Sequence, residues 1–272
     1  MSKALPLWKR LWPLSQVRQW RDGQIETFYR RQGFLPIDET KDQDIFICGF
    51  PKSGNTWVQN LIASLVFGLE PRYLSDRIVQ EFVPDVHQSS FYKRFLDTAF
   101  FKTHYPFRAR YRRIVHLVRD PRDVAASFFH FEQTRGKPVT LEQTIERVIE
   151  KWRAHTQSYL KLNGQMPVML LRYEDLLSQP ENEVERLLEL CQLERSEEIR
   201  ARAIKGNDFT SIATREKTFG MANPRWSSEK TFFRKGRAGA YSETLNSDNV
   251  AAIESSLSDL MSFLGYEIAG KS

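Results

Sequence analysis

The sequence has few cysteines and no long apolar run. Its only two cysteines, Cys48 and Cys191, are too few for a disulfide framework. Both lie in apolar stretches, which predicts buried free thiols and a reducing, cytoplasmic location. The longest uncharged run, residues 53–69, contains several polar residues and is shorter than the roughly 20 apolar residues that span a bilayer. Charged residues interrupt the N-terminal stretch, so no signal peptide is expected.

Internal repeats and low-complexity tracts are also missing. The chain is 41% hydrophobic and 27% charged, which excludes a disordered or collagen-like protein. Its 272 residues are enough for one large domain or two small ones. No cysteine and histidine cluster has metal-ligand spacing, so no metal is expected.

The formal net charge of +6 is distributed unevenly. Residues 1–36 contain seven lysines and arginines against two acids, which leaves +5 on this segment and +1 on residues 37–272. The same segment holds three of the six tryptophans, Trp8, Trp12 and Trp20. We therefore divide the chain into a basic aromatic N-terminal arm, residues 1–36, and a single domain, residues 37–272. The nearly neutral domain predicts no nucleic-acid partner.

Apolar runs and helical periodicities alternate along the domain. The predicted strands are residues 44–50, 99–102, 114–118 and 168–172. The predicted helices are residues 56–69, 120–134, 141–162, a segment that starts at Pro180, and residues 248–264. This order predicts an α/β fold with a mainly parallel sheet flanked by helices on both faces, and a ligand site at the carboxyl ends of the strands.

The loop after the first predicted strand has the composition of an anion site. Residues 50–57 read FPKSGNTW, so backbone N–H groups at a helix N-terminus lie beside Lys52 and two hydroxyls. Gly49 and Gly54 have the spacing of a nucleotide P-loop, but Asn55 stands where that motif has its lysine. A polar turn with a surface lysine is the alternative for this loop taken alone.

This loop resembles the 5′-phosphosulfate loop, P-K-S-G-T-T-W, of the cytosolic sulfotransferases, with Asn55 as the only departure. The resemblance implies a P-loop NTPase-like fold and the donor 3′-phosphoadenosine 5′-phosphosulfate (PAPS), which leaves adenosine 3′,5′-bisphosphate (PAP) as product. Lys52 is then expected to bridge to the departing phosphate oxygen, and Trp57 to stack on adenine. The remaining nucleotide-binding residues implied for this loop are Ser53, Gly54, Asn55 and Thr56.

Residues 101–106, FKTHYP, resemble the K-T-H-x-P segment of the same family. The resemblance implies that His104 is the general base for a hydroxyl acceptor, a task suited to a group that titrates near neutral pH. Lys102 is expected to help Lys52 neutralise the leaving group. We interpret the other histidines as structural; they are His87, His116, His130 and His155.

Two further segments resemble the 3′-phosphate site of the family. Residues 113–127 resemble a strand followed by R-[DN]-x-[KR]-D-x-x-x-S, which implies Arg119 and Ser127 as ligands. Arg122 and Asp123 are interpreted as a solvated or structural ion pair and are assigned no ligand role. The second segment, resembling F-x-R-K-G, comprises Phe232, Phe233, Arg234, Lys235 and Gly236. Beyond it Ala240 and Tyr241 replace an aspartate and a tryptophan of the family, which leaves the packing of this loop open.

Two shorter resemblances concern the adenine. Tyr173 matches the tyrosine of a Y-E-D sequence at a strand end. Thr210, Ser211 and Ile212 match a T-S-F segment, with isoleucine in place of the aromatic residue.

We therefore predict a sulfotransferase that moves a sulfuryl group from PAPS to a hydroxyl of a small, apolar acceptor. An apolar acceptor pocket is suggested by Phe82, Phe91, Phe129 and Phe131. One alternative is a P-loop kinase or NTPase, and another is a non-catalytic membrane-surface adaptor on the same fold. For the arm, a peripheral contact with anionic lipid competes with packing on its own domain. The oligomeric state is left open.

Overall fold

The computed structural model describes residues 14–162, 164–220, 233 and 235–268. Four parallel strands form the central sheet in the order β4-β2-β5-β6. Their bounds are β2 (Ile45–Gly49), β4 (Phe100–Thr103), β5 (Arg113–Val118) and β6 (Val168–Arg172). Every residue of β2 is buried, as is typical of a parallel strand covered on both faces. The predicted α/β fold is therefore confirmed.

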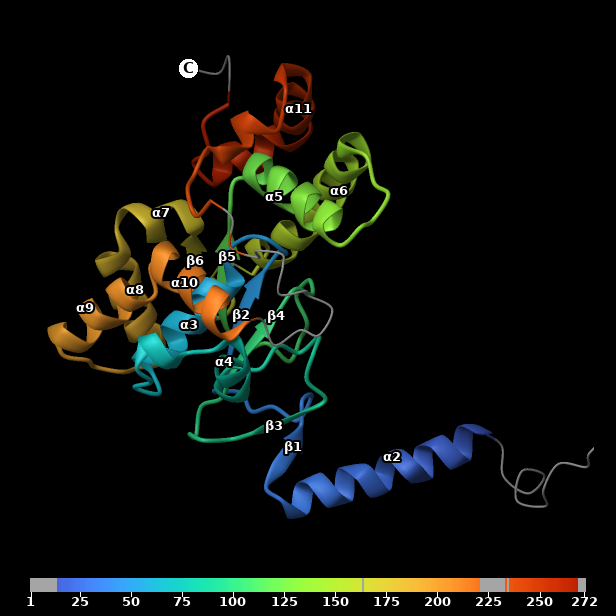
Figure 1. Ribbon diagram of the computed structural model, residues 1–272. Coiled ribbons are helices and arrows are strands. Elements are labelled where there is room, and N and C mark those ends of the chain that lie inside the picture. Colours follow the sequence, from blue (N-terminus) through green and yellow to red (C-terminus); the bar gives the residue numbers. More distant parts are fainter. Residues whose placement is uncertain (1–13, 163, 221–232, 234, 269–272) are drawn as a thin grey trace, which may run out of the picture.

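Two groups of helices cover the two faces of this sheet (Figure 1). One face, which includes Ile45, Ile47 and Val115, packs against α3 (Asn55–Leu65), α8 (Pro180–Cys191) and α9 (Glu197–Gly206). The opposite side of the sheet is covered by α5 (Pro121–Thr134), α6 (Leu141–Leu160) and α11 (Ser247–Phe263). A cavity lies at the carboxyl ends of the strands. The described residues form four further α-helices, α2 (Leu14–Arg31), α4 (Asp76–Phe82), α7 (Tyr173–Ser178) and α10 (Phe209–Phe219), and two short 3-10 helices, η1 (Pro71–Tyr73) and η2 (Ala240–Glu243).

The helix that follows β5 begins where the sequence predicts. The side chain of Asp120 accepts a hydrogen bond of 2.8 Å from the backbone N–H of Arg122, and Pro121 occupies the first helical position. By contrast, α3 ends at Leu65, four residues before the predicted end at residue 69. The expectation of two buried thiols is correct for Cys48 but wrong for Cys191, which is only partly buried at the end of α8.

A small second sheet joins the arm to the domain. Strand β1 (Phe34–Pro36) pairs antiparallel with β3 (Phe91–Lys93), and Tyr29 of α2 stacks on Phe91 with ring centroids 4.6 Å apart. Beyond this contact α2 projects away from the rest of the molecule (Figure 1). No helix in the described part of the chain is long and apolar enough to span a bilayer.

Candidate active site

A cavity of about 790 Å³ lies at the carboxyl ends of the four parallel strands. The segments that follow β2, β4, β5 and β6 all contribute to its wall, as expected for an open α/β sheet. The predicted site residues that line it are Lys52, Gly54, Asn55, Thr56, Trp57, Lys102, His104, Arg119, Ser127, Tyr173, Ile212, Phe233, Lys235 and Gly236.

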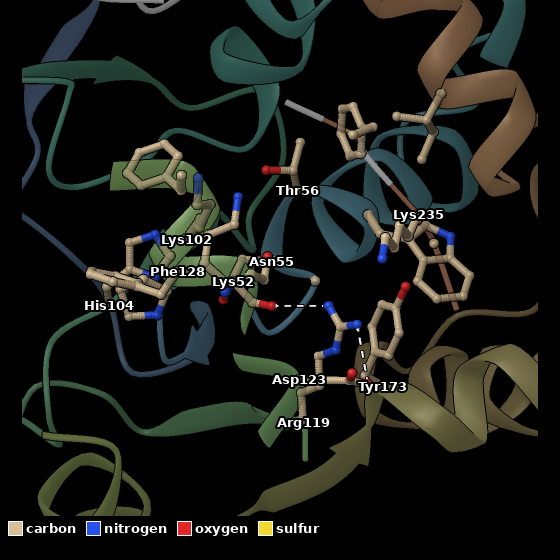
Figure 2. A pocket seen from close by; sticks show the side chains of 18 of the residues that line it. Lys52, Asn55, Thr56, Lys102, His104, Arg119, Asp123, Phe128, Tyr173 and Lys235 are labelled. Atoms are coloured by element: carbon tan, nitrogen blue, oxygen red, sulfur yellow. Dashed lines mark hydrogen bonds and ion pairs between the residues drawn. The ribbon is translucent and has the colours of Figure 1, made fainter. Parts of the chain in front are cut away.

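Three of the described predicted residues do not line the cavity, and two more are not described. Ser53 is fully buried behind the loop, while Thr210 and Ser211, on the first turn of α10, are not among the lining residues. Phe232 and Arg234 lie outside the described residues. In Figure 2, Lys52, Lys102 and His104 gather on one side of the cavity, while Arg119, Tyr173 and Lys235 lie on the other.

The loop between β2 and α3 is shaped to hold an anion. Gly54 caps α3 with φ of 100°, a conformation that disfavours side chains, and a Cβ there would lie 2.7 Å from the ring of Tyr173. The hydrogen bond from Trp57 N–H to Gly54 O starts the helix, so the preceding N–H groups have no intrahelical acceptor. The hydroxyl of Ser53 is buried without a hydrogen-bond partner. The backbone N–H groups of this helix start fit a phosphate, whereas the Ser53 hydroxyl lies behind the loop.

The side chain of Asn55 stabilises the loop through contacts with Phe50 and Gly49. Its amide donates to the carbonyl of Phe50 at 2.9 Å, and a Cβ on Gly49 would lie 2.4 Å from its Oδ1. Gly49 and Asn55 therefore pack against each other, which is how the departure from the family loop is accommodated. Lys52, in the same loop, places its ammonium 4.7 Å from the ring centroid of Phe131.

His104 follows β4 and has one defined tautomer. Its Nδ1 lies 2.7 Å from the carbonyl oxygen of Gly49, which can only accept, so Nδ1 carries the proton and Nε2 keeps a lone pair. Burial, reinforced by the charge of Lys102, lowers the pKa of His104 to about 4. The imidazole is therefore neutral at pH 7 and able to accept a proton at Nε2.

The sequence did not reveal that two further side chains, Asp85 and His87, lie next to His104. The carboxylate of Asp85 lies 2.9 Å from Lys102 Nζ, with both side chains nearly fully buried. The Nε2 atom of His87 accepts a 2.9 Å hydrogen bond from the backbone N–H of His104. Our interpretation of His87 as structural did not include this hydrogen bond to His104. The neighbours of His87 in the sequence match no motif, and the hydrogen bond joins residues 17 positions apart.

Arg119 holds the opposite side of the cavity. Its guanidinium lies 4.2 Å from the ring centroid of Tyr173, donates to the carbonyl of Lys52 at 3.3 Å, and pairs with Asp123 at 3.4 Å (Figure 2). Ser127 lines the cavity from α5, and the ring of Trp57 meets Tyr173 edge-on at 5.5 Å. An arginine, a serine and two aromatic rings thus surround one compartment.

The loop that follows residue 234 is anchored by Asp123. The carboxylate of Asp123 accepts the backbone N–H groups of Gly239 at 2.9 Å and Tyr241 at 2.8 Å. The ring of Tyr241 packs under the guanidinium of Arg122, at 4.7 Å. The substitutions in this loop relative to the family are therefore compatible with an ordered position beside Arg119.

The acceptor side has fewer phenylalanines than expected. Phe131 and Phe128, both on α5, line the cavity. The predicted contribution of Phe82, Phe91 and Phe129 is wrong, since none of them is a lining residue; Phe82 packs on Phe67 and Phe91 on Tyr29. Polar side chains also line the cavity, among them Asp76, Gln80, Gln88 and Arg135. Among the described residues, no group of three or more potential ligands could hold a metal ion.

The sulfotransferase domain model matches residues 42–265. The chain belongs to the sulfotransferase family. Cytosolic sulfotransferase 12 of Arabidopsis thaliana is 26% identical, over 91% of this chain and 87% of its own length. Sulfotransferase 1A1 of Bos taurus is 25% identical, over 81% of this chain and 84% of its own length.

Solved structures confirm the sulfotransferase fold. A retinol dehydratase in complex with androsterone and the inactive cofactor PAP superimposes with a TM-score of 0.63 and 18% identity, over 85% of this chain and 83% of that one. A mouse sulfotransferase complexed with PAP gives a TM-score of 0.61 and 18% identity, over 81% and 84% of the two chains. The resemblance drawn from four short motifs is thus supported along most of the chain.

Proposed function

We propose that this sulfotransferase transfers a sulfuryl group from PAPS to a hydroxyl of a small acceptor. The observation that carries the proposal is the convergence on one cavity of the anion loop, the neutral imidazole of His104 and the guanidinium of Arg119. Two fold neighbours were solved with PAP, which supports the same nucleotide here. When bound, PAPS supplies the activated bond between the sulfuryl sulfur and an oxygen of the 5′-phosphate.

We assign each residue a role that its position supports. Nε2 of His104 takes the proton of the acceptor hydroxyl. Lys52 and the free N–H groups of its loop stabilise negative charge on the leaving phosphate, with Lys102 beside them. Arg119 and Ser127 hold the 3′-phosphate, and the rings of Trp57 and Tyr173 hold adenine. The loop that carries Phe233, Lys235 and Gly236 closes over the nucleotide.

The acceptor proposed is a small molecule with an apolar body. Phe128 and Phe131 offer apolar surface near Lys52, and the retinol dehydratase neighbour was solved with retinol or androsterone. Transfer of labelled sulfuryl from PAPS to a panel of phenolic, steroidal and aliphatic alcohols tests this. Labelled product from polar acceptors alone contradicts the apolar acceptor.

Thermal shift separates this function from that of a P-loop kinase. PAP is expected to raise the melting temperature, while ATP with magnesium is expected to leave it nearly unchanged, because Lys52 is displaced from the Walker position. The reverse pattern, with no labelled product from any acceptor, contradicts the proposal.

We also propose that the arm contacts anionic membrane surfaces. Basic residues flank Trp20, whose side chain lies outside the described part of the structure, as do Trp8 and Trp12. In the described part of α2, Phe28 is 60% exposed and Ile25 is also exposed. Such a helix suits an interface between water and lipid.

A further inference from the structure

Asp85 lies between α4 and β3 and lines the cavity with its carboxylate fully partnered. One oxygen lies 2.9 Å from Lys102 Nζ and accepts from Gln88 Nε2 at 2.9 Å, while the other accepts the backbone N–H of His87 at 2.9 Å. Burial opposes its ionisation most strongly, but the charges of Lys102 and His104 and the hydrogen bonds from His87 and Lys102 together lower the pKa of Asp85 to about 2. The residue is therefore an anion at working pH.

The backbone around Asp85 also adds to the edge of β4. Lys102 N–H donates to the carbonyl of Pro84 at 2.9 Å, and Val86 N–H donates to the carbonyl of Lys102 at 3.0 Å. These bonds make an isolated parallel bridge between Asp85 and Lys102. Lys102 is thus held by both its main chain and its side chain.

His87 extends this arrangement to the general base. Its backbone N–H is bound by Asp85, and its Nε2 accepts the N–H of His104. The imidazole rings of His87 and His104 stack with centroids 5.4 Å apart. The ring of Tyr105 also packs against that of His87, with centroids 4.1 Å apart. A short chain of hydrogen bonds therefore runs from the Asp85 carboxylate to the His104 main chain.

The Asp85 carboxylate has an electrostatic effect on His104 as well as a structural one. Lys102 and His87 both lower the pKa of His104, Asp85 raises it, and His155 of α6 also interacts with it. When His104 takes a proton, it becomes a cation beside the Lys102 ammonium. The Asp85 carboxylate is the described anion that balances this pair.

We propose that Asp85 is a positioning residue for sulfuryl transfer, whose carboxylate fixes the Lys102 ammonium and, through His87, the backbone of His104. The inference rests on the proposed function. Asp85 acts through Lys102 and His104, so it contributes to the chemical step and not to nucleotide binding.

A second buried ion pair provides a matched control. The carboxylate of Asp44 pairs with Arg94 at 2.8 Å and accepts the backbone N–H of Ala99, but it precedes β2 at the opposite end of the sheet. Asp44→Asn removes a buried carboxylate of the same kind, far from the cavity.

The test compares Asp85→Asn, Lys102→Met, the double variant and Asp44→Asn, using PAPS and the acceptor selected by the panel. We expect Asp85→Asn to lower kcat at least about tenfold, since misplacing a reacting group by about 1 Å can cost about 100-fold. The affinity of Asp85→Asn for PAP should stay within about twofold of wild type. This limit is far below a tenfold change, which corresponds to about 1.4 kcal/mol of binding free energy. Asp44→Asn should keep the wild-type kcat.

The double variant decides whether Asp85 acts through Lys102. It contains no unpaired buried charge, so it tests the proposal even where Asp85→Asn fails to fold. We expect it to lose less kcat than the product of the two single losses, because the part of the Asp85 effect that passes through Lys102 is already lost in Lys102→Met. A further fall of similar size to the single Asp85→Asn loss, or an equal loss in Asp44→Asn, overturns the inference.

A titration of His104 by NMR in the PAP-loaded protein needs no acceptor. Asp85→Asn removes the charge that raises the pKa of His104, so the midpoint should move to lower pH, while Asp44→Asn should leave it unchanged. An unmoved midpoint in Asp85→Asn overturns the electrostatic part. Absence of sulfuryl transfer in the wild type contradicts the proposed function instead, so the two failures are distinguishable.

Discussion

The imidazole of His104 is fixed by one backbone carbonyl, that of Gly49, 55 residues earlier in the chain. This bond selects the tautomer with a lone pair on Nε2, and burial keeps the ring neutral. Arg119, across the cavity, is fixed by Tyr173 and Asp123. At the residue scale, accepting the proton and binding the anion are therefore tasks of different side chains. Substitutions at His104 and Arg119 can distinguish the two tasks.

His104→Ala is expected to slow the chemical step strongly and to leave nucleotide binding intact. Loss of general base catalysis should lower kcat by about 100-fold to 10,000-fold. Calorimetric titration with PAP should give nearly the wild-type Kd, and Arg119→Ala serves as the reciprocal control, with PAP binding weakened. Loss of PAP binding in His104→Ala contradicts the assignment of the base.

The elements around the cavity depend on two close approaches of main chain to ring. Gly54 lies against Tyr173, and Gly236 lies against Phe209 at the start of α10. At Gly236 a Cβ would be 2.0 Å from the Phe209 ring, and φ is 61°. In the same loop Gly239 has a similar φ of 72°, but a Cβ there would meet nothing within 4 Å.

Gly236→Ala and Gly239→Ala therefore form a matched pair. Both carry the backbone penalty of about 1 kcal/mol for a side chain at positive φ, but only Gly236→Ala also displaces Phe209. We expect Gly236→Ala to weaken PAP binding about tenfold or more relative to Gly239→Ala, measured by calorimetry. Equal affinities in the two variants contradict a role for the Gly236–Phe209 contact in the nucleotide compartment.

For the whole molecule, buried histidines make stability depend on pH. Burial lowers the pKa of His116 to about 3, that of His104 to about 4, and that of His155 well below its usual value. Below about pH 6.5 the unfolded chain binds more protons than the folded one, so stability is present above that pH. It is lost as the pH falls toward these lowered values.

His116→Phe tests this linkage, because neither ring nitrogen of His116 has a hydrogen-bond partner and the ring stacks on Tyr159 at 4.8 Å. Each such histidine should cost about 2 kcal/mol of unfolding free energy between pH 7 and pH 5. Urea denaturation at both values should show that the variant loses less stability by about that amount. An unchanged pH dependence contradicts the protonation of His116 on unfolding.

The arm supports a separate prediction at the molecular scale. Because the described contacts of α2 with the domain lie at its C-terminal end, where Tyr29 meets Phe34 and Phe91 and Arg30 pairs with Glu39, deleting residues 1–20 should leave the melting temperature almost unchanged. Cosedimentation should show weaker binding to anionic vesicles and no change with zwitterionic ones. Equal binding to anionic vesicles before and after deletion ends the membrane proposal.

The sequence by itself determined the parallel α/β fold, the family and about half of the residues that line the cavity. Short motifs at strand ends are local, and a parallel sheet brings its carboxyl ends to one edge, so Lys52, His104, Arg119 and Tyr173 could be placed together. The tautomer of His104 and the Asp85–Lys102 pair were decided only by tertiary structure. Both join segments far apart in the chain, where the packing of side chains, and not their periodicity, sets the contact.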